Sequence, residues 1–324
     1  MEENTEQRVD LTLFSEKIQE LKDRIASVIV GQEQTVDLVL TAILANGHVL
    51  IEGVPGVAKT LLARLTARLI DADFSRVQFT PDLMPSDVLG TTVFNMKTNG
   101  FDFHQGPIFA DIVLVDEINR APAKTQAALF EVMEERQISI DGTTHRMGDL
   151  YTILATQNPV EQEGTYKLPE AQLDRFLMKI TMDYPSLEEE VNILERHHTN
   201  AALVKLDDIT PAITKEGLLS LRAFMNQVFV DRTLLQYIAL IVQQTRTSKA
   251  VYLGASPRAS VAMLQSSKAY ALLQGRDFVT PEDIKFVAPY VLQHRLILTA
   301  EAEMEGYSPV KVTQRLIDKV EVPK

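Results

Sequence analysis

Residues 53–60 form a short segment in which two glycines precede a lysine and a threonine, Gly53-Val54-Pro55-Gly56-Val57-Ala58-Lys59-Thr60. Backbone N–H groups of such a loop can surround phosphate oxygens, the lysine can reach the terminal phosphates, and the threonine hydroxyl can hold Mg²⁺. The pattern predicts a phosphate-binding loop with Thr60 as a metal ligand. Ala58 stands where the strict loop has its second glycine, so the backbone there must accept a Cβ atom. An ordinary glycine-rich turn is the alternative.

Two acidic residues, Asp116 and Glu117, follow the apolar run at 112–115. Such a run predicts a buried parallel strand whose carboxyl end lies at the sheet edge that also carries the phosphate loop. Asp116 would hold the water shell of Mg²⁺, and Glu117 would polarise the attacking water. Acids that only cap a strand are common, but their combination with residues 53–60 favours hydrolysis.

Asn158 follows a third apolar run, at 153–155, and precedes Pro159. Beside a terminal phosphate, its amide could orient water. A turn asparagine before proline explains the residue almost as well.

Two arginines are further candidates. Ser256-Pro257 has the form of a helix start, with serine as the cap, and it places Arg258 near the positive end of the helix dipole. A phosphate contact would explain a cation at that place. Arg175 could simply pair with Asp174 or Glu170 at the surface.

The apolar pattern predicts the elements that carry these residues. Helical spacing indicates helices over 13–29, 35–46, 61–70 and 122–136, and short apolar runs indicate strands over 48–51, 77–79, 112–115, 151–155 and 179–182. This alternation predicts a parallel sheet covered by helices on both faces. Asn99-Gly100 and Asp141-Gly142 predict two β-hairpin insertions, over 93–104 and 136–147.

After Pro185 the character of the chain changes. Ser186-Leu187-Glu188-Glu189 has the form of a capping box, and Thr280-Pro281-Glu282-Asp283 is another strong helix start. We therefore expect two domains, an α/β core over 1–185 and a helical domain over 186–324. Phe101 and Phe103 alternate in the first hairpin and should share one face, which meets a client, a neighbouring subunit or the core.

Composition limits the functions available to the chain. It has 324 residues, no cysteine and a formal charge of −12, which excludes disulfide frameworks and thiol nucleophiles and argues against non-specific nucleic-acid binding. The apolar stretches are too short for a membrane span, and the acidic start lacks the order of a secretory signal. We expect a cytoplasmic protein.

Together these motifs resemble the MoxR family of AAA+ ATPases. The segments that carry the resemblance occur in the family's order over nearly the whole chain. They are Val30-Gly31-Gln32-Glu33 and residues 53–60, 115–120, 155–159, 168–176 and 254–259. Alanine at position 58 is usual in the family.

The resemblance implies a P-loop NTPase-type sheet of order 5-1-4-3-2 with a helical C-terminal lid. It makes Asn158 sensor 1, Arg258 sensor 2, and Arg175 a finger that reaches a neighbour's nucleotide, and it makes the hairpins a helix-2 insert and a pre-sensor-1 insertion. The implied nucleotide contacts are Val30, Gly31 and Gln32 at the adenine, and Gly53, Val54, Pro55, Gly56, Val57, Ala58, Lys59, Thr60, Leu61, Asp116 and Arg258.

The expected function is Mg²⁺-dependent ATP hydrolysis in a ring, usually hexameric, that moves the core against the lid and remodels a protein client. The family's roles are protein maturation or metal-cofactor insertion, often beside a protein with a von Willebrand A domain. The alternatives are a metal-chelatase subunit, a related ATPase acting on nucleic acid, and a nucleotide-gated scaffold with little turnover. A small-molecule kinase is a weaker alternative, since it needs neither Arg175 in trans nor a lid that carries Arg258.

Overall fold

The central sheet has five parallel strands. The computed structural model describes residues 11–159, 166–199 and 206–323. The sheet order is β2-β5-β8-β1-β9, which for these five strands counted along the chain is the predicted 5-1-4-3-2. Their bounds are Val49–Gly53 for β1, Phe74–Gln78 for β2, Ile112–Asp116 for β5, Thr152–Gln157 for β8 and Met178–Met182 for β9.

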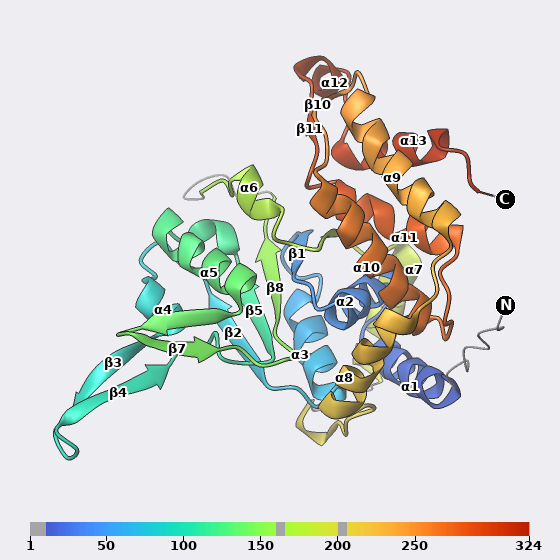
Figure 1. The fold of residues 1–324 in the computed structure, drawn as a ribbon. Helices are drawn as coiled ribbons and strands as arrows, with labels where there is room; N and C mark the ends of the chain where they lie inside the picture. Colours follow the sequence, from blue (N-terminus) through green and yellow to red (C-terminus); the bar gives the residue numbers. More distant parts are fainter. Residues whose placement is uncertain (1–10, 160–165, 200–205, 324) are drawn as a thin grey trace, which may run out of the picture.

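Helices cover both faces of this sheet, as the continuous apolar runs require. Alternate residues of β5 enter different apolar clusters. Ile112 and Leu114 pack with α1, α2 and α3, whereas Val113 and Val115 pack with α5 (Figure 1). The bounds are Thr12–Val28 for α1, Glu33–Leu44 for α2, Lys59–Leu69 for α3 and Ala123–Glu135 for α5.

Two antiparallel hairpins project from the α5 side of the core, away from the C-terminal helices (Figure 1). Strands β3 (Gly90–Asn95) and β4 (Gly100–Gln105) follow the short helix α4 (Pro85–Leu89), and β6 (Gln137–Ile140) and β7 (Thr143–Arg146) follow α5. Asn99 and Asp141 have φ of 49°, the left-handed conformation that tight hairpin turns need. Both predicted hairpins are confirmed.

The C-terminal part is helical, with one small two-stranded sheet. The predicted capping box forms at Ser186, and the predicted helix start at Thr280 is confirmed by α11, which begins at Pro281. Ser256 sits at its cap position without a side-chain hydrogen bond. The helices are α7 (Leu187–His198), α8 (Lys215–Phe224), α9 (Arg232–Thr247), α10 (Pro257–Leu273), α11 (Pro281–Leu292), α12 (Ala300–Met304) and α13 (Pro309–Lys319), and the strands are β10 (Val251–Leu253) and β11 (Ile297–Leu298).

The largest apolar cluster crosses from the α/β part into these helices. It joins α1, α2 and α3 to buried residues of α9, α10 and α11, such as Ile241, Met263 and Val287. The lid is therefore packed on one flank of the core over an extended surface. None of the described helices is long and apolar enough to cross a membrane.

Candidate active site

The phosphate loop joins the end of β1 to the start of α3. Gly56 has φ of 90°, and Ala58 has φ of 61°, so two residues of the loop have left-handed backbone conformations. A Cβ atom at Gly53 would lie 2.8 Å from the carbonyl oxygen of Met182, so close packing against β9 requires glycine there. The loop thus has the tight, glycine-dependent path of a phosphate cradle.

Lys59 reaches back over this loop. Its ammonium group donates hydrogen bonds to the carbonyl oxygens of Gly53 and Val54. Burial lowers the pKa of Lys59, while the carboxylates of Asp116 and Glu117 oppose that change. The cation therefore lies within electrostatic reach of both acids, as a lysine that contacts terminal phosphates should.

Asp116, at the end of β5, is held by two donors. Its Oδ1 accepts a hydrogen bond of 2.9 Å from the Thr156 hydroxyl, and its Oδ2 accepts one of 2.7 Å from Nε of Arg76. The carboxylate of Asp116 and the hydroxyl of Thr60 are the oxygen donors that Mg²⁺ prefers. These two residues fit a metal that serves a nucleotide.

Glu117 follows in a left-handed conformation, with φ of 56°, which turns its side chain away from the line of β5. Its backbone N–H donates to the Thr156 hydroxyl at 2.9 Å. Its carboxylate accepts a hydrogen bond of 2.7 Å from Gln78 and lies 3.1 Å from Nε of Arg120. Glu117 is thus fixed beside β2 in this conformation.

The sheet order places the third strand end between these groups. Because β8 lies between β5 and β1, Asn158 follows a strand flanked by the one that ends in Asp116 and the one that leads into the phosphate loop. Its side chain is 6% exposed. This edge therefore gathers Lys59, the two acids and Asn158, which is the set that phosphoryl transfer to water needs.

The segment Val30-Gly31-Gln32 links α1 to α2. Gly31 has φ of 72°, and a Cβ atom there would overlap the carboxylate of Glu189, near the start of α7. The segment predicted for the adenine thus lies under the first helix after the core.

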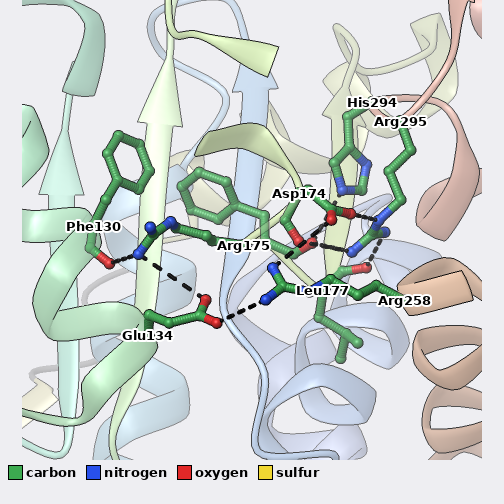
Figure 2. Close-up of polar contacts among 9 residues, drawn as sticks. Phe130, Glu134, Asp174, Arg175, Leu177, Arg258, His294 and Arg295 are labelled. Atoms are coloured by element: carbon green, nitrogen blue, oxygen red, sulfur yellow. Dashed lines mark hydrogen bonds and ion pairs between the residues drawn. The ribbon is translucent and has the colours of Figure 1, made fainter. Parts of the chain in front are cut away.

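Arg175 and Arg258 lie close together (Figure 2). Arg175 donates to the carbonyl oxygen of Phe130, and its Nη1 is 4.0 Å from Oε2 of Glu134. Arg258 comes from the lid and contacts Oε1 of the same glutamate at 3.1 Å. One carboxylate therefore bridges the two guanidinium groups.

A second acid continues this chain of charges. Asp174 lies 4.0 Å from Arg258 and 2.6 Å from Arg295, which is 5% exposed and also donates to the carbonyl oxygens of Phe176 and Leu177. Arg175 therefore pairs with Glu134, whereas Asp174, one of its expected partners, pairs with arginines of the lid.

These arginines and the phosphate loop lie at opposite ends of the sheet strands. The backbone N–H of Leu177, just before β9, donates to the carbonyl oxygen of His48, just before β1. Residues 174–177 thus lie beside the amino ends of the strands, whereas Lys59, Asp116 and Asn158 follow their carboxyl ends. Within one chain, Arg258 is with Arg175 rather than with the phosphate loop.

Sequence reasoning missed five residues of these networks. Arg76 and Gln78 flank the buried Val77 of β2, and this alternation was a signal that they share one face beside β5. Thr156 follows the predicted strand over 151–155 and belongs to no motif that points to its role. No local signal could single out Glu134 or Arg295, because their partners come from distant segments.

Comparisons with known proteins agree with this geometry. Residues 48–178 match the profile of the ATPase family associated with various cellular activities (AAA), and residues 243–318 match the AAA lid domain.

Relatives cover almost the whole chain. The uncharacterized protein YeaC of Bacillus subtilis (strain 168) is 47% identical over 93% of both chains. The Chaperone MoxR1 of Mycobacterium tuberculosis is 44% identical over 93% of this chain and 81% of its own. A crystal structure of a Cytophaga hutchinsonii protein matches 97% of both chains, with a TM-score of 0.89 and 40% identity. With its phosphate loop, paired acids and lid, the chain is an ATPase that belongs to the MoxR family of AAA+ proteins.

Proposed function

We propose that this chain is one subunit of a ring, by expectation a hexamer, in which each ATP is hydrolysed between two subunits. The observation that carries the proposal is the separation of the two halves of the site. Lys59, Glu117 and Asn158 follow the carboxyl ends of the sheet strands, and Arg175 and Arg258 lie beside the amino ends. A head-to-tail arrangement of copies joins one edge to the other.

Within this composite site each group has a separate task. The loop N–H groups and Lys59 hold the phosphates, Asn158 orients the water, and Glu117 accepts its proton. Mg²⁺ held by Thr60 and through Asp116 would supply neutralising charge on the phosphate oxygens. Arg175 and Arg258 of the next subunit would stabilise the charge that develops at the terminal phosphate.

The exposed pair Arg258–Glu134 can open for this role. The Arg258 side chain is 63% exposed and its partner 38%, so their attraction is worth roughly 0–1 kcal/mol. An arginine placed on a phosphoryl group can be worth about 10³–10⁵ in turnover. A neighbour's nucleotide therefore competes easily with Glu134 for the guanidinium group.

The motion that follows hydrolysis would act on a protein client. The relative named Chaperone MoxR1 supports a chaperone-like role. Maturation or metal-cofactor insertion, with a von Willebrand A partner, is the specific form that we expect, and a cytoplasmic site fits it. A chelatase subunit would use the same hydrolytic site, whereas a nucleotide-gated scaffold would leave Glu117 and Arg175 without a task.

Subunit mixing tests the composite site. Arg175→Ala subunits keep an intact phosphate loop, and Lys59→Ala subunits keep an intact Arg175. Each variant alone should hydrolyse ATP at least 10³-fold more slowly than the unmodified chain, since removal of such an arginine costs about that much. Mixtures at fixed total protein should regain activity, and the same should hold for Arg258→Ala with Lys59→Ala.

A matched control and a contradicting result are available. Arg315 is an exposed arginine of α13 that stacks on Tyr307, so Arg315→Ala should hydrolyse normally and leave nothing to restore. If native mass spectrometry shows mixed rings and activity still fails to rise at any ratio, Arg175 does not act in trans.

Client binding needs its own experiment. Glu117→Gln should bind ATP and hold a ring on its client, whereas Lys59→Ala/Glu117→Gln should not load ATP. A protein co-purified with the first and absent from the second would be the client. Equal recovery with both would count against an ATP-dependent remodeler.

A further inference from the structure

The helix α7 turns its apolar side chains toward solvent. Leu187, Val191 and Leu194 recur at helical spacing and form one exposed strip, here called the α7 stripe, in which Leu187 is 82% and Leu194 is 64% exposed. None of the residues of α7 is buried. A soluble helix normally turns its apolar strip toward the core, so this strip needs another surface to cover it.

The opposite face of α7 is the one attached to the core. Arg196 donates to the carbonyl oxygens of Ala26 and Ser27, at 3.2 and 2.8 Å, and Glu189 lies over Gly31. Glu189 and Arg196 are two turns apart and share this inner face. The stripe therefore points outward from the nucleotide-binding half of the composite site.

Further exposed apolar side chains lie on the lid segment that carries Arg258. They are Tyr252 and Leu253 of β10, before Arg258 in the sequence, and Val261 of α10, after it, and are here together called the Tyr252 patch; Tyr252 is 79% exposed. Val261 lies one helical turn after Arg258 and therefore on the same side of α10.

The charges around the two surfaces are complementary. The α7 stripe is flanked by the exposed acids Glu188, Glu190 and Glu195. Arg246 and Lys249 are exposed near the Tyr252 patch in the sequence. Unlike charges at the rim of an interface steer association and set its register.

We propose that the α7 stripe of one subunit docks on the Tyr252 patch of the next copy of this chain. The inference rests on the proposed function, because a head-to-tail contact needs two different complementary surfaces on each copy. When the arginines of one copy reach the nucleotide of the next, the surfaces beside them are carried into the same interface. The apolar contact would thus seal the composite site from solvent.

Two double variants test the contact separately. One is Leu187→Ser/Leu194→Ser on the stripe, and the other is Tyr252→Ser/Val261→Ser on the patch. All four side chains are exposed, so thermal stability should stay unchanged. At a saturating non-hydrolysable ATP analogue, each variant alone should sediment as a monomer, because every one of its interfaces contains one damaged surface.

Mixing gives the decisive result. The stripe variant keeps its patch and the patch variant keeps its stripe, so an equimolar mixture should form dimers and nothing larger. Val93→Ser/Met96→Ser removes comparable exposed apolar surface from the first hairpin and should assemble as the unmodified chain does.

Three other results would overturn the inference. Normal rings from the stripe variant would mean that another molecule covers α7. Dimers of the patch variant alone would indicate contact between two α7 helices. If the unmodified chain itself stays monomeric with the analogue, the proposed ring fails together with this contact. If instead the contact variants assemble normally while the Arg175→Ala and Lys59→Ala mixture regains activity, the composite site stands and only the contact is wrong.

Discussion

Replacement of Ala58 by glycine should stabilise the nucleotide-free protein. Ala58 has φ of 61° and ψ of 23°, a left-handed conformation that costs an L-residue roughly 1–2 kcal/mol and costs glycine little. Glycine also gives the unfolded chain more freedom, which removes about 0.4–1 kcal/mol of stability. The difference leaves a gain of roughly 0.5–1 kcal/mol in the free energy of unfolding.

The same substitution in an ordinary helix should have the opposite sign. Ala127 is exposed in the middle of α5, where glycine costs about 1 kcal/mol relative to alanine. Urea unfolding of Ala58→Gly, Ala127→Gly and the unmodified chain, without nucleotide, should therefore separate the two variants by about 1.5–2 kcal/mol. ATP affinity of Ala58→Gly should stay within a few-fold of the original, because the phosphate cradle keeps its path.

Loss of stability in both variants by a similar amount would refute this reasoning. It would mean that the Ala58 methyl group makes contacts worth more than the left-handed conformation costs. A large loss of ATP affinity would mean that the Ala58 methyl group also makes important contacts in the nucleotide-bound state.

Three further predictions concern catalysis, packing and pH. Lys59→Ala should abolish ATP binding, whereas Glu117→Gln should bind ATP and fail to hydrolyse it. Isothermal titration would measure the binding and phosphate release the hydrolysis. Equal loss of affinity in both variants would contradict the assignment of phosphate binding to Lys59 and water activation to Glu117. Phe103→Ala should lower the melting temperature, because its ring lies 4.3 Å from that of His145, whereas Phe101→Ala should not, because Phe101 is 73% exposed and pairs with Phe94; equal shifts would be inconsistent with this packing. Burial lowers the pKa of His48 from 6.5 to about 3 and also lowers the pKa of His294, so below pH 6.5 the unfolded chain binds more protons than the folded one. Stability is therefore full above that pH and falls as the pH drops toward 3. His48 alone should remove about 1 kcal/mol of the free energy of unfolding between pH 7 and 5.5, His294 should act in the same direction, and a flat urea-unfolding series would disprove this.

The local parts of the fold were predictable from the residues. Strands β1, β5 and β8 contain short apolar runs, and each hairpin turn carries a dipeptide that accepts positive φ, so these elements followed directly. Strand β2 (Phe74–Gln78) is mixed in character and begins three residues before the predicted run at 77–79. The positions of Lys59, Asp116 and Glu117 followed as well, because parallel strands end at one edge.

The contacts of the arginines could not be predicted in the same way. Arg258 meets Glu134 across 124 positions of sequence, and Asp174 meets Arg295 across 121. Such pairs depend on how the lid packs on the core, which no periodicity encodes. The uncapped Ser256 is a smaller example, since its sequence context favours a side-chain bond that the structure does not form.

The buried Arg295 has a mechanical consequence. It joins the segment after α11 to the residues just before β9 through Asp174, Phe176 and Leu177, and the neighbouring His294 adds a hydrogen bond to the carbonyl oxygen of Phe176. In a ring, the lid and core of one chain would then move together, rather than against each other as the resemblance implies. The flexible contact would be the nucleotide between adjacent subunits. Hydrolysis would change the angle between adjacent subunits. If these angles differed around a closed ring, the subunits could no longer lie in one plane.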